Sequence, residues 1–204
     1  MARRTREEAA QTRAAVLETA LALFGRKGYA GTRLDEIADE IGLSRGAIYG
    51  HFKTKPELFE QVMKLGQDPV YGLLNAALAD TGPPLAAIRR FMVDWFCMMV
   101  EHDQARQATE ILLNKAELTE ELEQTLQKER QLTADMIAGL ASIYERARSA
   151  GDVDRDLDPA QAGLHIFAYV MGVTQTWMFN EQLFDLRGSA EGLADRFLRS
   201  LEPD

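Results

Sequence analysis

The spacing of apolar residues restricts this 204-residue chain to a helical fold. Apolar side chains recur every three or four residues through nearly the whole sequence, which is the period of one face of an α-helix. No segment shows the strict alternation of apolar and polar residues that is typical of a half-buried strand. We therefore predict an all-α protein.

Glycine, proline and capping residues mark where these helices begin and end. Gly28 closes the first helix, and Thr32 and Ser44 are placed to cap the next two. Thr54 and Glu57 form a capping box for the fourth helix, which Asp68-Pro69 then bends or breaks. The expected helices span residues 5–26, 33–41, 45–51, 55 to beyond 69, 85–101, 104–115, 119–150, 159–180 and 189–201.

Charge is distributed unevenly along the chain. The net charge of −9 argues at first against DNA binding, because a basic surface is the usual electrostatic footprint of such proteins. Residues 1–55, however, carry ten Lys and Arg against seven Asp and Glu, a net charge of +3 that leaves −12 on residues 56–204. This asymmetry allows DNA contact at the N-terminus and disfavours it elsewhere.

Cysteine content and hydropathy indicate the compartment. The single cysteine, Cys97, excludes an internal disulfide and fits a reducing cytosol, so we expect a cytoplasmic protein. No run of 18 apolar residues occurs, and the charged N-terminus is not followed by the apolar stretch of a signal peptide. We therefore expect no membrane partner.

The segment that indicates function is RLDEIADEIGLSRGAIYGHF, residues 33–52. It predicts two short helices joined by a tight turn, in which Gly42 adopts the unusual backbone angle and Leu43 fills the space between the helices. Such a helix-turn-helix lays its second helix in the major groove of DNA. The residues expected to contact double-stranded operator DNA are Thr32, Arg33, Ser44, Arg45, Gly46, Ala47, Tyr49, His51, Lys53 and Lys55.

Different chemistry is expected along this set. Arg45 suits a guanine edge or a phosphate, and the small Gly46 and Ala47 allow close approach to the groove. Lys55 lies at the start of a helix, whose free amides are a natural phosphate seat. The simpler alternative is an ordinary helical turn with a solvated basic surface, which geometry alone does not exclude.

The amino-acid sequence of this segment resembles that of the TetR/AcrR family of regulators. The matching stretches are FGRKGYAGT and LDEIADEIGLSRGAIYGHFKTKPELF, residues 24–32 and 34–59, and YVMGVTQTWMFNEQLFDLRGSA, residues 169–190, is a looser match to the branch that represses multidrug efflux pumps. The resemblance implies an all-helical homodimer, a palindromic operator and release from DNA when a small ligand binds. Gly50 stands where that branch often has Trp, so the operator sequence cannot be transferred from relatives.

We predict two domains, a helix-turn-helix DNA-binding domain over residues 1–55 and a helical ligand-binding and dimerisation domain over residues 56–204. Residues 91–100, FMVDWFCMMV, form the expected central helix of the second domain, and Asp94 there requires a cation, a hydrogen-bond donor or water. For most of these side chains a plain helical core is the favoured explanation. The residues expected to line a pocket for a small hydrophobic or aromatic effector are Met63, Gln67, Phe91, Asp94, Trp95, Met98, Glu110, Leu113, Asn114, His165, Tyr169 and Val173.

Met63 and Gln67 enter this set through the resemblance, because they stand where the efflux-repressor branch often supplies a Trp and a Glu to its pocket. Without that Glu, the resemblance does not imply a preference for cationic ligands. Asp94, Glu110 or Glu117 could take its place.

Small residues and apolar stripes near the C-terminus predict a homodimer. Gly163, Ala168 and Gly172 would let a second helix approach, and Leu193, Phe197 and Leu201 form one stripe of the last helix. Intramolecular packing is the simpler alternative. A single helix-turn-helix reads only one half-site, however, so DNA binding itself favours a dimer.

Two alternative classes of protein can be compared with these features. A DNA-binding regulator without an effector, whose C-terminal body only dimerises, fits the same features. An enzyme does not, because the sequence has no phosphate-binding glycine loop and no nucleophile elbow. His51, His102 and His165 lack the spacing of metal ligands, so we expect neither metal nor cofactor.

Overall fold

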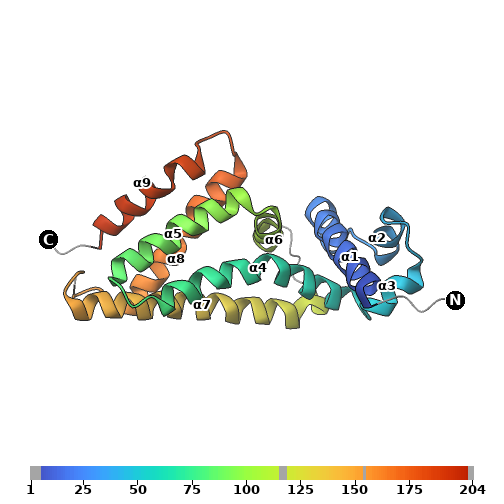
Figure 1. Cartoon of the computed structure of the whole chain (residues 1–204), viewed down its shortest axis with the longest axis horizontal. Helices are drawn as coiled ribbons and strands as arrows, with labels where there is room; N and C mark the ends of the chain where they lie inside the picture. Colours follow the sequence, from blue (N-terminus) through green and yellow to red (C-terminus); the bar gives the residue numbers. More distant parts are fainter. Residues whose placement is uncertain (1–5, 115–118, 154, 202–204) are drawn as a thin grey trace. The chain divides into compact units, whose positions relative to one another are not determined.

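The computed structural model describes residues 6–114, 119–153 and 155–201, and over these residues the chain is helical without any strand. The all-α prediction is therefore confirmed. The elements, drawn in Figure 1, are α1 (Arg6–Lys27), α2 (Leu34–Glu40), α3 (Arg45–His51), α4 (Lys55–Ala79), α5 (Pro84–Glu101), α6 (Asp103–Asn114), the 3-10 turn η1 (Glu120–Leu122), α7 (Glu123–Ala150), α8 (Pro159–Phe179) and α9 (Leu186–Arg199).

The chain divides into two compact units. Unit 1 takes in the described residues of Met1–Gln67 and Gln104–Gln127, and unit 2 takes in those of Asp68–Asp103 and Lys128–Asp204. Packing thus joins α6, η1 and the first half of α4 to the N-terminal helices. The predicted functional boundary at residue 55 is a different division, and it stays a prediction.

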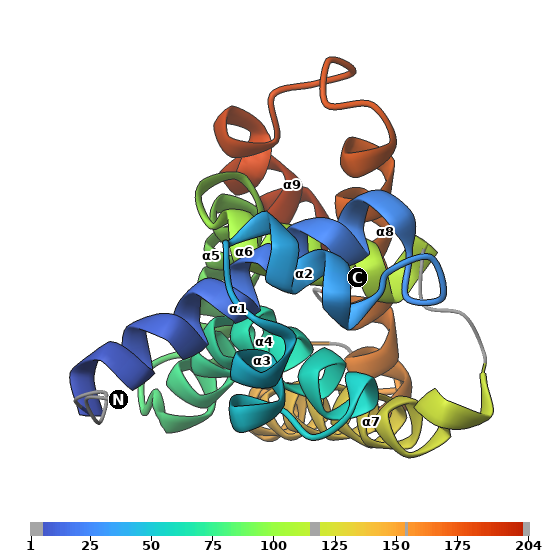
Figure 2. The ribbon, with the colours of Figure 1, turned by 90° about the vertical axis from the view of Figure 1, so that its right-hand side faces the viewer.

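Unit 1 is built on a buried cluster of aromatic and aliphatic side chains from α1 to α4, α6 and the start of α7. At its centre the rings of Phe24, Tyr29 and Phe59 lie with centroids 5.2 to 5.9 Å apart. Full burial of a side chain of this size contributes roughly 1.5–3 kcal/mol. This cluster fixes the position of α2 and α3 on α1, which Figure 2 shows from the side of these helices.

Glycines end the first two helices as predicted. Gly28 and Gly42 have φ angles of +71° and +65°, the left-handed region where a side chain is disfavoured. The predicted N-cap at Thr32 is wrong. Its hydroxyl donates to the Gly28 carbonyl at 2.8 Å, and the cap position of α2 is Arg33, whose N–H donates to the Glu36 carboxylate at 3.3 Å.

The other caps are close to their predicted positions. Ser44 occupies the N-cap of α3, although its hydroxyl accepts no capping hydrogen bond there. At the start of α4, the Thr54 hydroxyl accepts from the Glu57 N–H at 3.2 Å, and the Glu57 carboxylate accepts from Lys53 N–H at 2.7 Å. The capping box is thus present, with its return bond displaced by one residue. Pro69 lies inside a continuous α4, so the helix is not broken there.

Unit 2 places α5 against α8 and α9. Trp95 is buried, and its indole N–H donates to the Thr174 hydroxyl of α8 at 3.0 Å. The prediction of a fully surrounded α5 is wrong at Asp94, which is exposed and can be solvated by water. The last helix begins at Leu186 and not at residue 189, because the Asp185 carboxylate caps it by accepting from Gly188 N–H at 2.9 Å.

Gly163 of α8 approaches another helix closely, but that helix belongs to the same chain. A Cβ at this position would lie 2.5 Å from the Ile137 carbonyl oxygen of α7. The glycine is therefore required by packing within unit 2, and its predicted place in a dimer contact is wrong. None of the described helices has the length and apolar character needed to span a membrane.

Candidate nucleic-acid interface

The turn between α2 and α3 holds α3 against the core on one side and leaves its other side exposed to solvent. Leu43 N–H donates to the Ala38 carbonyl at 2.9 Å across the turn that Gly42 makes. Ile37 and Ile48 are completely buried beneath the two helices, and half-buried Leu43 packs on the same core. The predicted helix-turn-helix is thus present, and its core leaves the opposite side of α3 open.

That open side is polar and lightly covered. Arg45, Gly46, Tyr49 and Gly50 are all exposed, whereas Ile48 points into the core. A Cβ built on either glycine meets no atom within 4 Å. We call the side of α3 that carries these four residues, together with Lys53, the α3 face. Its glycines leave room for a partner to approach the helix backbone.

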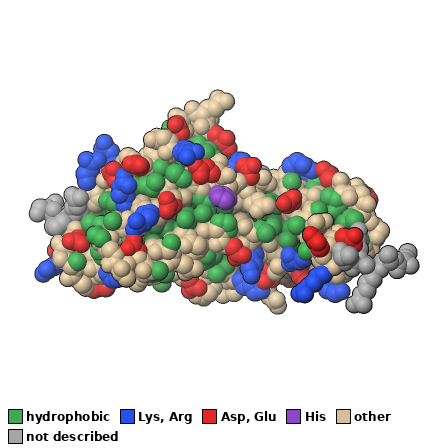
Figure 3. Space-filling view, in the orientation of Figure 1, with side chains coloured by type: hydrophobic (Ala, Val, Ile, Leu, Met, Phe, Trp, Pro, Cys, Tyr) green, Lys and Arg blue, Asp and Glu red, His purple; other side chains and the backbone are tan. Residues whose placement is uncertain are grey.

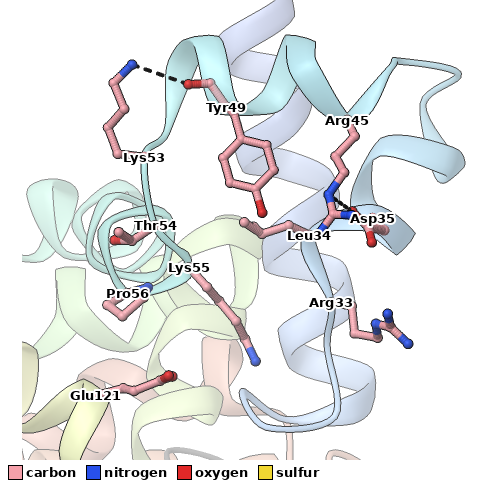
Figure 4. Close-up of a pocket in the computed structure, with 10 residues that line it drawn as sticks. All are labelled: Arg33, Leu34, Asp35, Arg45, Tyr49, Lys53, Thr54, Lys55, Pro56 and Glu121. Carbon is pink, nitrogen blue, oxygen red and sulfur yellow. Dashed lines mark hydrogen bonds and ion pairs between the residues drawn. The ribbon is translucent and has the colours of Figure 1, made fainter.

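Arg45 on the α3 face is held by two neighbours. Its Nε lies 2.8 Å from Oδ1 of Asp35, in the first turn of α2, and Figure 4 shows the two side chains directed at each other. The guanidinium carbon lies 5.8 Å from the centroid of the Tyr49 ring. Hydrogen bonding to Tyr49 and the negative charge of Asp35 raise the pKa of Arg45, which is cationic in any case. No sequence pattern indicated this pairing across ten residues.

Two lysines that the sequence grouped together point in opposite directions in Figure 4. Lys53 is exposed, and its ammonium donates to the Tyr49 carbonyl at 3.4 Å. Lys55 is half-buried, and its Nζ lies 4.1 Å from the centroid of the Tyr29 ring, a cation–π contact. Its side chain therefore packs within unit 1, which does not favour the phosphate contact predicted for it.

A residue far along the chain completes the surroundings of Lys55. The Tyr29 hydroxyl donates to the Glu121 carboxylate of η1 at 3.0 Å. Burial, and then this bond and the carboxylate charge, raise the pKa of Tyr29 above its usual value. Glu121, Asp35, Leu34, Thr54 and Pro56 also line the hollow between α2, α3 and α4 that Figure 4 draws, and sequence reasoning missed them all as site residues.

The remaining predicted DNA contacts differ in exposure. Arg33 and Ser44 are exposed, and Ala47 and His51 are half-buried. The Thr32 side chain is 1% exposed and its hydroxyl is engaged within the protein. Thr32 is therefore removed from the side chains that can reach a phosphate.

The chain is similar to known families of proteins over most of its length. The description "Bacterial regulatory proteins, tetR family" matches residues 16–62, and "MAATS-type transcriptional repressor, C-terminal region" matches residues 83–203. The HTH-type transcriptional regulator TtgR of Pseudomonas putida is 33% identical over 202 residues, which are 98% of this chain and 96% of the relative. The chain belongs to the TetR family of transcriptional regulators.

Two solved TetR-type structures share the fold over nearly the whole chain. NalD, the secondary repressor of the MexAB-OprM multidrug efflux pump in Pseudomonas aeruginosa, superposes with a TM-score of 0.85 at 27% identity, covering 98% of this chain and all of NalD. SmeT, the repressor of the Stenotrophomonas maltophilia multidrug efflux pump SmeDEF, is known in complex with triclosan. That complex gives a TM-score of 0.82 at 27% identity and covers 95% of this chain and 93% of SmeT.

The twelve predicted effector contacts of this TetR-family protein are divided between the units, five in unit 1 and seven in unit 2. Met63 is buried in the core of unit 1, whereas Phe91 and Trp95 are buried in the core of unit 2. Four of the predicted residues are exposed, namely Asp94, Leu113, Asn114 and His165. Four others are half-buried, namely Gln67, Met98, Glu110 and Val173. Glu117, named as a substitute for the missing acid, lies outside the described residues. The common pocket stays a prediction.

Tyr169 and Val173 belong to a different surface from the one predicted. They line an apolar groove between α8 and α9, whose other residues are Ala168, Gly172, Thr176, Phe184 and Leu193. The Tyr169 hydroxyl donates to the Leu193 carbonyl at 3.1 Å, and its ring lies 4.6 Å from that of Phe197. The α8 face toward Trp95 is instead the one with Thr174. The structure thus does not bring Tyr169 and Val173 together with Trp95.

Basic side chains are not confined to unit 1. In Figure 3, Lys and Arg lie among Asp and Glu over α5 and α9 as well as over the N-terminal helices. In unit 2 several are ion-paired, since Arg89 lies 3.1 Å from Glu191 and Arg187 lies 2.7 Å from Glu101. Net charge along the sequence therefore says less about the DNA-binding side than the exposed residues of α3 do.

Proposed function

We propose that this TetR-family protein is a ligand-responsive transcriptional repressor of a multidrug efflux operon. In this proposal a homodimer binds a palindromic operator in double-stranded DNA through the α3 face of each copy. A small hydrophobic or aromatic effector then releases it from the DNA.

The observation that carries the proposal is the α3 face itself. A short helix held at its back by buried Ile48 offers Arg45, Tyr49 and Lys53 to a partner, with two glycines between them that leave the backbone accessible. This matches a recognition helix, whose first turns meet base edges while flanking cations meet phosphates. The efflux assignment rests on NalD and SmeT, both named as repressors of multidrug efflux pumps.

DNA binding is tested with the region upstream of the gene and of any neighbouring pump genes. We expect a protected site with two-fold symmetry, whose half-sites are about 34 Å apart or a multiple of that distance. A scrambled duplex of the same length is the control. Equal affinity for both duplexes, measured at one stated salt concentration, would contradict sequence-specific repression.

Effector release is tested separately by calorimetry with triclosan as the probe, since triclosan is the ligand seen with SmeT. Coupling of roughly 1–3 kcal/mol, or about tenfold to a hundredfold in affinity, suffices to shift operator occupancy. Linkage then requires operator DNA to weaken triclosan binding by the same factor. If triclosan and other aromatic compounds each bind with equal affinity in the presence and absence of operator DNA, the alternative of a regulator without an effector is favoured.

A further inference from the structure

We propose that Asp35 is a positioning residue that sets operator specificity by orienting Arg45 toward a guanine. The inference rests on the proposed function, because it assigns a role at the same α3 face. It follows from the contacts of the two side chains and from the geometry of the guanidinium group.

Asp35 and Arg45 form an ion pair within the helix-turn-helix. Asp35 lies in the first turn of α2 and Arg45 in the first turn of α3, so the ion pair of 2.8 Å spans the two helices of the motif. Oδ1 of Asp35 is closed off from water, and among the described residues it has the ion pair with Arg45 but no hydrogen bond. Arg45 balances the negative charge of this carboxylate. Moving the guanidinium away would leave a partly buried charge unpaired, which costs free energy.

The ion pair leaves part of the Arg45 guanidinium open to a partner. A guanidinium is planar and offers its N–H groups in a fixed fork. Nε lies beside Asp35 and the guanidinium also hydrogen-bonds to Tyr49, so the N–H groups of the Nη atoms that neither neighbour engages remain for recognition, and the Arg45 side chain is 66% exposed. Two parallel donors on one edge match O6 and N7 of guanine in the major groove. The Tyr49 ring, 5.8 Å from the guanidinium carbon, limits movement on another side.

The negative charge of Asp35 should affect operator DNA and scrambled DNA differently. A carboxylate beside the DNA repels phosphates, so Asp35 weakens binding to any sequence. A positioning role predicts the opposite effect on the correct operator. Removing the charge should therefore strengthen binding to scrambled DNA and lower the preference for the operator over scrambled DNA. A residue that only supports the fold would not produce this combination.

Asp39 provides a matched control. It lies one turn further along α2, is exposed, and Asp39→Asn removes the same charge from the same helix. Affinities for the operator and for a scrambled duplex are measured with the full-length protein and with Asp35→Asn, Asp39→Asn, Arg45→Ala and the Asp35→Asn/Arg45→Ala double variant.

We expect Asp35→Asn to lower the operator-to-scrambled affinity ratio by about tenfold, within the range of one base contact. Asp39→Asn should leave that ratio unchanged. In the double variant the ratio should equal that of Arg45→Ala, because Asp35 acts only through Arg45. Single-base substitution of the operator should relax preference at the same position in Asp35→Asn and Arg45→Ala.

A second variant protects the test against loss of folding. Asp35→Glu keeps the negative charge at the start of α2, where it stabilises the helix, but displaces the carboxylate by one methylene group. We expect an unchanged melting temperature and a lowered affinity ratio. The inference is wrong if Asp35→Asn behaves like Asp39→Asn, or if its effect adds to that of Arg45→Ala. If the unaltered protein shows no preference for its upstream DNA, the proposed function fails instead.

Discussion

The α3 face of unit 1 and the α8–α9 groove of unit 2 are both open in the single chain, but their chemistry is opposite. The α3 face is formed by charged and polar side chains with small residues between them. The groove is lined mainly by Ala, Val, Leu and aromatic side chains, and Phe179, the last residue of α8, and Leu183, in the segment that connects α8 to α9, are 93% and 61% exposed. Water solvates the first surface well and the second poorly.

This difference indicates what kind of partner each surface meets. A charged partner such as DNA would bind the α3 face reversibly, with an affinity that falls as the salt concentration rises. Covering an apolar groove removes apolar surface from water and so lowers the free energy, and we expect a second copy of the chain to be the partner that covers it. Substitutions confined to one unit therefore test the two surfaces separately.

The largest effect is expected in the core that shapes the α3 face. Phe59→Ala should destabilise unit 1 by about 3–5 kcal/mol, because its ring is fully buried between Phe24 and Tyr29. Denaturant unfolding measures this loss, and DNA binding should fall with it. Phe179→Ala removes the same ring from an exposed position in unit 2 and should change the stability of unit 1 by less than about 0.5 kcal/mol. Equal effects of the two variants would contradict the burial of the Phe59 ring in the core of unit 1.

The next effect concerns the groove. Val173→Arg places a charge among apolar side chains, and we expect it to weaken self-association by at least about a hundredfold, since an unpaired charge buried in an interface is strongly unfavourable. Sedimentation measures the monomer–dimer equilibrium. Ala160→Arg, at an exposed position in the first turn of α8, is the control. If Val173→Arg remains as dimeric as Ala160→Arg, the groove is not the dimer surface.

The sequence predicted local structure well where one residue decides it. Gly28 and Gly42 mark turns because their backbone angle excludes most other residues. Thr32 fits a capping pattern equally well, yet its hydroxyl bonds to the preceding turn, an alternative that short polar side chains always have. Local patterns cannot choose between two such bonds.

Contacts between residues far apart in the chain could not be predicted from the sequence, for a different reason. Glu121 is 92 residues from the Tyr29 hydroxyl it accepts from, and only the packing of η1 in unit 1 brings them together. Helical spacing placed Tyr169 and Val173 on one face of α8 correctly. It could not tell which helix that face meets, so they were expected in a pocket and lie in the α8–α9 groove.

A smaller and more specific effect is expected at Arg45. Arg45→Ala should weaken operator binding by about 1–3 kcal/mol and relax preference at one base position, if the guanidinium reads a base. Gel-shift titration against operator variants measures both. Arg26→Ala removes an exposed arginine at the end of α1, where it pairs with Glu40, and should leave base preference unchanged. Unchanged affinity and preference in Arg45→Ala would exclude base recognition by this residue.

The smallest effect separates the two lysines beside the α3 face. Lys53→Ala should weaken binding to all sequences alike and reduce the slope of log K against log salt by about one, since one phosphate contact is lost. Lys55→Ala removes the same charge two residues later, but its Nζ lies over the Tyr29 ring, so we expect a smaller change in slope and some loss of stability of unit 1. Binding measured at several salt concentrations gives both slopes. If Lys55→Ala also loses a full unit, then Lys55 must leave Tyr29 when DNA binds, and a phosphate can compete with the aromatic ring for that ammonium.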